Sequence, residues 1–358
     1  MSIIYLISDY GRLIKRGEVL QLRKGDDLLK TIFPFKTEQM VVIGRVEITS
    51  AAIHLLMRHQ IDTVFLHRNG RFNGKFAFAT GKNIFLRQKQ FKSLEDETFC
   101  LDMARAVVNG KLRNQLTFMQ RTMRTKRVDD QAATALRELK QSLRSLGTAD
   151  NIASIRGYEG YGARNYFSVF RQALKPDWAV FNGRSLNPPQ DNVNSVLSFL
   201  YTLIFYRVDA ALESVGLDPY VGYLHQLNYG KPTLAFDLVE EFRVPLGDML
   251  TVSLFNLGIL SPGDFDDCDF SADGDFPVAP EDEKAMDSEP LPEKRGVLLT
   301  KGGLRKVITH FEKKLDTPFF YPPLETRITY KKLFFEQARH FRRILAGEEA
   351  TYRPFQIK

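Results

Sequence analysis

The sequence predicts an α+β protein in which a mostly β domain over residues 1–90 precedes a larger all-α domain over residues 91–358. Two observations support this division. Short runs rich in β-forming residues, separated by turn residues, dominate the first 90 positions, whereas apolar residues recur at helical spacing from about position 92. A chain of 358 residues is also long enough for two domains.

The N-terminal part contains β-rich runs and one helix. The runs IIYLIS and EVLQLR are expected to be strands, and the Asn-Gly pairs at 69–70 and 73–74 are typical of hairpin turns. A helix is expected over 49–60, where Thr49 or Ser50 can cap the first turn.

The C-terminal part is expected to be helical from about residue 92, with the helices interrupted by an acidic segment. A first long helix includes 101–127, and its basic residues fall largely on one side; this face is either simply solvated or a track for phosphates. The apolar stretch at 196–206 is too short to span a bilayer and is expected to lie in a buried core helix. Helices are further expected at roughly 130–146, 152–174, 192–214, 234–258, 302–315 and 326–346.

Charge is distributed unevenly along the chain. The formal net charge is +7, yet residues 261–296 hold twelve Asp or Glu and three Lys or Arg, so the rest of the chain is strongly basic. A basic body favours a polyanionic partner, with nucleic acid first and an acidic membrane surface second; charge that merely maintains solubility is the alternative. The acidic segment itself is expected to be a mobile loop, because it lacks apolar periodicity.

Cysteine usage and the N-terminal residues indicate the compartment. Cys100 and Cys268 form neither a disulfide framework nor a CxxC metal site, so a reducing environment is expected. The first twenty residues lack the basic and small-residue features of a secretory signal. We therefore expect a soluble, cytoplasmic protein with no membrane association.

The stretch GYLHQLNYGKPTLAFDLVEEFR places acids in an apolar helix. Asp237, Glu240 and Glu241 can share one arc of that helix, and the preceding turn can fold His225 back toward the helix start. Converging carboxylates need a cation, which is either a metal or the arginine that follows them. Histidine with carboxylates and no cysteine suits Mg²⁺ or Mn²⁺. Glu241 has no role in this scheme and is expected at the surface or paired with a lysine.

A second acidic position lies at the entry of another expected helix. Glu159 stands between two glycines, with Arg156 and Arg164 close by in sequence. A salt bridge to either arginine is as good an explanation as a functional role.

Four motifs occur in order along the C-terminal part: YEGYGARNYF, RSLNPPQDNVNSVLSFLYTLIFYRVDAALESVGLDPYVGYLH, LAFDLVEEFR and LTKGGLRKVI. Together they closely resemble the motifs of the CRISPR-associated adaptation integrases, the family usually called Cas one. The resemblance covers about residues 150–315. It implies an N-terminal β-sandwich-like domain followed by a helical catalytic domain, in agreement with the pattern of elements above.

The resemblance also implies a metal site. The family's divalent-metal ligands match Glu159, His225 and Glu240, which are therefore expected to be catalytic and to bind Mg²⁺ or Mn²⁺. Positions with a supporting role are matched by Asp237, Asn194 and Arg184. The basic residues expected to contact DNA are Lys111, Arg113, Arg121, Arg124, Arg164 and Lys231.

The activity implied by the resemblance serves prokaryotic antiviral defence. Family members join the 3′-hydroxyl ends of short duplex DNA to the CRISPR repeat by transesterification, and also show endonuclease and disintegration activity. They act as homodimers in a hetero-oligomeric complex with a small CRISPR adaptation partner protein. Two alternatives remain open, namely a repair nuclease for branched DNA and a non-catalytic DNA-binding scaffold.

Overall fold

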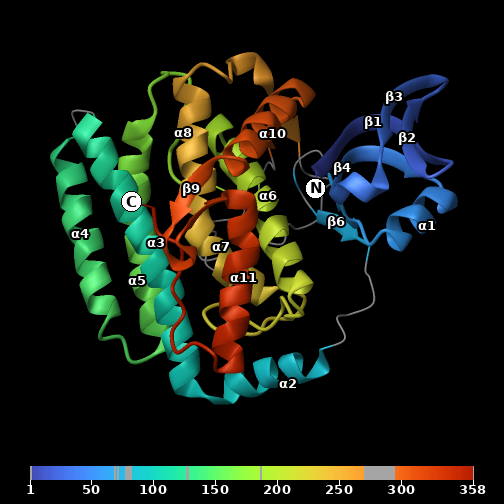
Figure 1. Cartoon of the computed structure of the whole chain (residues 1–358). Coiled ribbons are helices and arrows are strands. Elements are labelled where there is room, and N and C mark those ends of the chain that lie inside the picture. Colours follow the sequence, from blue (N-terminus) through green and yellow to red (C-terminus); the bar gives the residue numbers. More distant parts are fainter. Residues whose placement is uncertain are drawn as a thin grey trace. The chain divides into compact units, whose positions relative to one another are not determined.

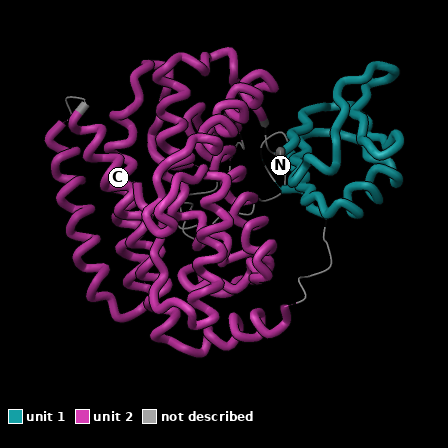
Figure 2. Tube along the Cα trace, viewed as in Figure 1, with its two compact units in different colours: residues 1–80 teal, residues 81–358 magenta. Residues whose placement is uncertain are grey.

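The computed structural model describes residues 2–67, 70, 72–76, 83–125, 129–185, 188–269 and 295–357 (Figure 1). The chain forms two compact units, Met1–Thr80 and Gly81–Lys358 (Figure 2). The boundary lies before the position expected at 90, because helix α2 (Ile84–Lys92) belongs to the second unit. Gln90 on this helix donates hydrogen bonds to the carbonyls of Asp218 and Val221, at 2.8 and 3.3 Å.

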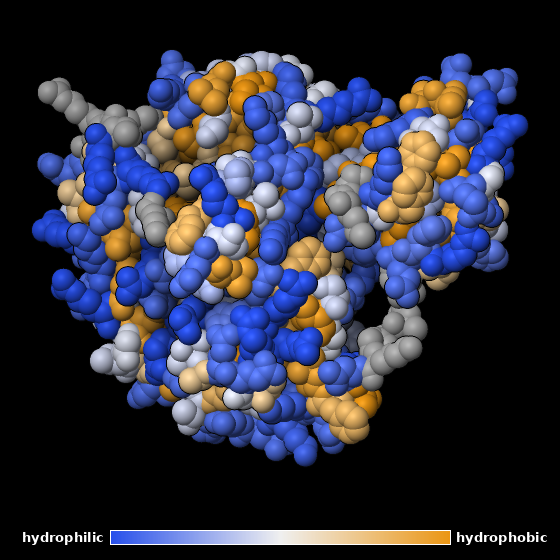
Figure 3. Space-filling view, viewed as in Figure 1, coloured by the Kyte–Doolittle hydropathy of each residue, from blue (hydrophilic) through white to orange (hydrophobic). Residues whose placement is uncertain are grey.

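Apolar side chains are largely enclosed within the units. The displayed face is mainly hydrophilic, with apolar residues in scattered patches (Figure 3). One patch lies over α2, where Ile84, Phe85 and Phe91 are exposed.

Unit 1 is built on one mixed sheet with the strand order β3-β2-β1-β4-β5-β6. Strand β1 pairs antiparallel with β2 and parallel with β4, and helix α1 (Ser50–Arg58) follows β4. The strands are β1 (Ser2–Arg16), β2 (Val19–Lys24), β3 (Asp27–Ile32), β4 (Thr37–Ile48), β5 (Asp62–Leu66) and β6 (Phe72–Lys75). The mostly β character expected for the N-terminal domain is thus confirmed.

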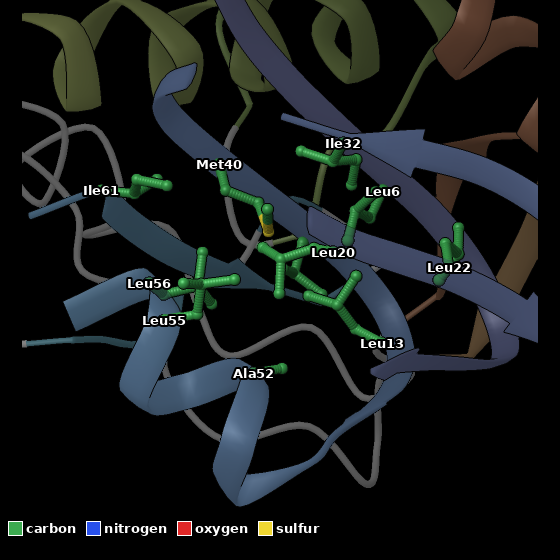
Figure 4. Close-up of a cluster of buried hydrophobic side chains, with 11 residues drawn as sticks. Leu6, Leu13, Leu20, Leu22, Ile32, Met40, Ala52, Leu55, Leu56 and Ile61 are labelled. Carbon is green, nitrogen blue, oxygen red and sulfur yellow. The ribbon is translucent and has the colours of Figure 1, made fainter. Parts of the chain in front are cut away.

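A bend in β1 allows both halves of this strand to contribute to one core. The register with β4 shifts between Ser8 and Gly11. Leu6 and Leu13 lie an odd number of positions apart and would face opposite sides of a regular strand, yet both enter the same buried cluster (Figure 4). Gly44 of β4 has a φ of +94°, and a Cβ there would lie 2.6 Å from the Ser8 carbonyl oxygen, so glycine is required at this crossing.

Unit 2 is mostly helical, as expected. Asp129, Asn151 and Asp191 cap the first turns of α4, α5 and α6, because each side chain accepts a hydrogen bond from a backbone N–H three residues on. The helices are α3 (Glu97–Thr125), α4 (Asp130–Leu146), α5 (Ile152–Ala173), α6 (Asn192–Ser214), α7 (Thr233–Phe242), α8 (Met249–Asn256), α10 (Lys301–Leu315) and α11 (Tyr330–Ala346).

Helix α6 is the most apolar long helix of the described residues. Its length and composition alone would allow it to cross a membrane, but 72% of its apolar window is buried within the structure. That burial is what a core helix requires.

Two expected helices differ from the structure. The helix expected over 234–258 is divided by a π-helical turn, Arg243–Asp248, in which Pro245 lacks the N–H that a regular helix would use. The helix expected from 326 begins at Tyr330, because Thr326–Thr329 forms strand β10 against β9 (Pro318–Tyr321).

The acidic segment expected as a loop over 261–296 has regular structure at both ends. Strand β7 (Phe265–Asp269) pairs antiparallel with β8 (Arg295–Leu299). The turn before β7 is held by Asp264, whose carboxylate lies 2.7 Å from Lys306 Nζ on α10 and whose carbonyl accepts from Thr300 N–H. The expected mobility of the intervening residues 270–294 lies outside the described residues.

Candidate active site

Helices α3 and α5 approach closely enough to join two charged side chains. A Cβ at Gly162 of α5 would lie 2.5 Å from the Leu112 side chain of α3, so a larger residue there would force Leu112 to shift. One turn away, Glu159 is only 2% exposed. Its Oε1 lies 2.6 Å from Nζ of Lys111 on α3.

Helix α7 packs against α3 as well (Figure 1). It brings a second carboxylate to the same lysine. Glu240 is fully buried, and its Oε2 lies 2.8 Å from Lys111 Nζ. Its other oxygen lies 3.0 Å from Arg243 Nη2. Two carboxylates and two cations therefore balance each other in the interior, which is the condition under which buried charges are tolerated.

Asp237 folds the segment before α7 onto the start of that helix. Its carboxylate accepts hydrogen bonds from the backbone N–H groups of Tyr223, Leu224 and His225, at 2.6, 3.0 and 3.0 Å. It also lies 2.7 Å from His225 Nδ1. With Nδ1 directed to the carboxylate, Nε2 is the ring nitrogen that can serve as a metal ligand.

These donors are of the kind that binds a hard divalent cation. Two carboxylates converge on a single point, and the imidazole is oriented by a third carboxylate, a donor set typical of Mg²⁺ or Mn²⁺ sites. The point of convergence holds the ammonium of Lys111, and within the described ranges no group of three His, Cys, Asp or Glu side chains is close enough to hold a metal ion. The donors that meet at this point are Glu159 and Glu240, both in contact with the Lys111 ammonium.

A cleft of 560 Å³ opens beside Glu159 and Lys111. Its lining combines positive charge with aromatic rings, the chemistry that binds phosphates and bases. The basic and aromatic residues of the lining, besides Lys111, are Arg164, Arg171, Arg184, Arg243, Phe167, Phe181 and Tyr201. A second cavity, of 640 Å³, shares Asn182, Gly183 and Arg184 with this cleft and extends to β7 and β8.

Tyr201 on α6 contacts two of the cleft arginines with its ring. The guanidinium carbons of Arg184 and Arg243 lie 5.0 and 4.9 Å from the centre of its ring. Its hydroxyl donates to Asp248 at 2.5 Å, and Tyr166 donates to the other Asp248 oxygen at 2.6 Å. Burial raises the pKa of both phenols well above the usual range, so both remain donors.

Comparison with known proteins identifies the family. A family model for the CRISPR associated protein Cas1 matches residues 4–270. The chain belongs to the Cas1 family. The CRISPR-associated endonuclease Cas1 3 of Thermus thermophilus is 31% identical over 360 residues, covering 100% of this chain and 98% of that protein. The CRISPR-associated endonuclease Cas1 2 of Rhodospirillum rubrum is 32% identical, covering 99% and 98%.

Solved structures share the fold. A Cas1 protein from Thermotoga maritima superposes with a TM-score of 0.77 at 21% identity, covering 98% of this chain and 99% of that one. A casposase bound to its integration product gives 0.80 at 21% identity, covering 100% and 95%.

Two of the three supporting residues expected from the Cas1 resemblance, Asn194 and Arg184, contact each other. Asn194 Oδ1 accepts from Arg184 Nη1 at 2.8 Å, and its Nδ2 donates to the Gly183 carbonyl at 2.8 Å and to Asp191 at 2.7 Å. Asn194 therefore directs Arg184, which in turn lines the cleft.

The residues expected to contact DNA lie in different parts of the structure. Arg164 is exposed and lines the cleft, whereas Lys231 is half-buried in the segment before α7. Lys111 differs from the expectation of a solvent-facing residue, because it is 6% exposed and ion-paired inside. The exposed face of α3, outside the cleft lining, carries Arg113, Arg121 and Arg124.

Glu241 was expected at the surface or paired with a lysine, and this expectation is wrong on both counts. It is 2% exposed and accepts hydrogen bonds from Gln337 Nε2 at 2.6 Å, from Tyr352 Oη at 2.7 Å and from the Phe355 N–H. Burial raises its pKa to about 7. The carboxylate thus ties the C-terminal residues to α7, a role that no motif indicated.

Proposed function

We propose that this chain is a divalent-metal-dependent DNA integrase of CRISPR adaptation. It joins 3′-hydroxyl ends of short DNA duplexes to the repeat by transesterification and also cleaves DNA as an endonuclease. The observation that carries this proposal is the meeting of Glu159 and Glu240, from two helices, at one buried cation position beside a basic cleft. The names of the relatives, CRISPR-associated endonucleases, and the casposase structure bound to integration product support it.

The proposed metal ligands are Glu159, Glu240 and His225. Mg²⁺ or Mn²⁺ held there would polarise the phosphoryl oxygen and stabilise charge on the attacking and leaving oxygens. Asp237 holds the Nδ1 side of His225, which orients the ring and increases the basicity of Nε2. A protein nucleophile is not needed, because the DNA hydroxyl attacks directly.

The cleft arginines act on the DNA. Guanidinium groups bind phosphate oxygens in pairs of parallel hydrogen bonds, so Arg164, Arg171 and Arg184 would hold the backbone in the cleft. Arg243 would bind a DNA phosphate in addition to Glu240, which it already contacts. Positioning of both DNA segments beside the carboxylates supplies the proximity that strand transfer requires.

The proposal includes partners and location. We infer that the chain acts as a homodimer together with a small CRISPR adaptation protein in the prokaryotic cytoplasm. A structural neighbour titled Cas6-RT-Cas1--Cas2 complex, with a TM-score of 0.81, supports this assembly, although this chain covers only 36% of that chain.

The decisive experiment is a strand-transfer assay with labelled short duplexes, a supercoiled plasmid bearing the cognate repeat, the small partner protein and Mn²⁺. Glu240→Gln keeps the size of the side chain and removes its charge. We expect joined product to fall by about a hundredfold or more, as for loss of a group that acts on the transition state, while DNA affinity stays within about threefold.

The same assay includes a control variant and distinguishes the two alternative functions. Glu348→Gln changes an exposed carboxylate on the C-terminal segment and should leave joining unchanged. Nicking without joining would favour the branched-DNA nuclease. Equal loss of joining, DNA binding and thermal stability would make Glu240 structural, in favour of the non-catalytic scaffold.

A further inference from the structure

Lys111 occupies the place where the two acidic helices meet. Its side chain is 8% exposed, and its ammonium contacts Glu159 at 2.6 Å and Glu240 at 2.8 Å. One cation thus neutralises carboxylates from α5 and α7 at once. The contacts are direct ion pairs in a buried setting, where each is strong and an uncompensated charge is costly.

We propose that Lys111 is an internal cation that holds Glu159 and Glu240 until the divalent metal binds, and that its ammonium then transfers to a DNA phosphate in the cleft. The inference rests on the metal site of the proposed function. It assigns to Lys111 a positioning role, because the metal can bind only after the Lys111 ammonium has left the two carboxylates.

The ammonium and the metal cannot share the position. Mg²⁺ binds carboxylate oxygens at about 2.0–2.1 Å, and the same oxygens lie within 2.8 Å of Lys111 Nζ. A metal between the carboxylates would therefore lie directly against a positive charge. Binding of the metal requires Lys111 to leave, so its ion pairs count against metal affinity in the absence of DNA.

The displaced ammonium has a place to go. A buried ammonium without a partner costs several kcal/mol, but lysine has a flexible four-carbon stem and Lys111 itself lines the cleft. The neighbouring lining residues Arg164 and Arg184 make that cleft attractive to DNA phosphates. A phosphate bound there offers the ammonium a new negative partner.

Arg243 plays a different part. It contacts the Glu240 oxygen that faces away from Lys111, at 3.0 Å. It can therefore keep Glu240 oriented while Lys111 departs.

The consequence is a coupling between two ligands. DNA lowers the cost of displacing Lys111, so DNA should tighten metal binding, and the metal should tighten DNA binding by the same factor. Metal alone should bind weakly, which limits metal-dependent cleavage until a DNA segment is in the cleft.

The test is calorimetric titration of Mn²⁺ into the full chain, with and without a short duplex that carries 3′-dideoxy ends and cannot react. Lys111→Met keeps the length of the side chain and removes its charge. Without DNA, we expect the variant to bind Mn²⁺ at least tenfold more tightly than the wild type, or about 1.4 kcal/mol. Lys140→Met, an exposed lysine of α4, should bind Mn²⁺ like the wild type.

The duplex should tighten Mn²⁺ binding about tenfold in the wild type and by less than about threefold in Lys111→Met. Thermal melting gives a further readout: the variant without metal should melt below the wild type, and Mn²⁺ should raise its melting temperature by more.

Two results would overturn the inference: unchanged or weaker Mn²⁺ binding by Lys111→Met, or no effect of the duplex on Mn²⁺ affinity in the wild type. The second needs no variant and remains decisive if Lys111→Met does not fold. Failure of the proposed function has a separate signature, since Glu240→Gln would then bind Mn²⁺ as tightly as the wild type.

Discussion

At the scale of single residues, the site depends on side chains that hold other side chains. Asp237 orients His225, and Asn194 orients Arg184. Tyr201 contacts two arginines with its ring and Asp248 with its hydroxyl. The groups expected to act on DNA are thus fixed in advance, which lowers the entropic cost of binding.

Replacement of Tyr201 should separate its two roles. Tyr201→Phe keeps the ring beneath Arg184 and Arg243 and loses one hydrogen bond, so DNA affinity should change by less than about threefold, within the roughly 1 kcal/mol of such a bond. Tyr201→Leu removes the ring and cation–π contacts of about 0.5–2 kcal/mol each. We expect it to weaken DNA binding about tenfold.

The measurement is the dissociation constant for a short duplex between 50 and 200 mM salt. The slope of log Kd against log salt should decrease for Tyr201→Leu, since arginines that are no longer positioned release fewer counterions. Equal behaviour of the phenylalanine and leucine variants would show that the ring does not position the arginines.

At the scale of elements, the C-terminal segment after α11 closes over the helix that carries Glu240. It is attached through Glu241 and through His340 of α11. His340 Nε2 accepts from the Arg353 N–H at 2.9 Å, while Nδ1 lies 2.9 Å from Glu349 and the ring stacks on Tyr352. The acceptor role of Nε2 requires the neutral ring.

This contact predicts a pH dependence of stability. Burial lowers the pKa of His340 below 6.5, although Glu349 acts in the opposite direction; Arg343 and Arg353 reinforce the lowering. Because the pKa of His340 is lower in the folded state, the unfolded state binds more protons as the pH falls. The contribution of His340 to the free energy of unfolding is therefore present above pH 6.5 and is lost below it.

Urea unfolding at pH 8 and pH 5.5 checks this for the wild type and His340→Gln. The variant should lose about 1 kcal/mol at pH 8, because one hydrogen bond is altered. Its further loss on acidification should be smaller than that of the wild type. The same pH-dependent loss in both proteins would contradict the role of His340.

At the scale of the whole molecule, the distribution of charge suggests where DNA would bind under the proposed function. The chain carries a net charge of +7, with the acids concentrated in residues 261–296. Two groups of described basic residues are candidates to bind DNA, namely the cleft arginines and the arginines on the exposed face of α3. Either group would make DNA binding strongly dependent on salt.

Two matched variants distinguish these surfaces. Wild-type binding to a duplex should weaken steeply with salt, with a slope of about −0.9 for each phosphate neutralised. Arg164→Ala, in the cleft, should reduce this slope by about one phosphate, whereas Arg113→Ala, on the face of α3, should not. A larger effect of Arg113→Ala would place the DNA along α3, and a flat salt dependence would exclude both surfaces.

Much of the fold and part of the site can be read from local patterns in the chain. The extents expected for the helices at 130–146, 152–174 and 192–214 agree with α4, α5 and α6 to within a residue, because apolar period and Asp or Asn caps are local properties. The order of four motifs likewise sufficed to recognise the Cas1 family, which the family model and the relatives confirm.

Contacts between distant residues had no such signal. The pairing of Lys111 with Glu159 and Glu240 depends on the close approach of α5 to α3 at Gly162, and the burial of Glu241 depends on the returning C-terminal segment. The sequence alone does not show whether a given charged residue is solvated or buried. Its partner is set by packing across the fold, so the roles of these residues emerged only when the helices were brought together.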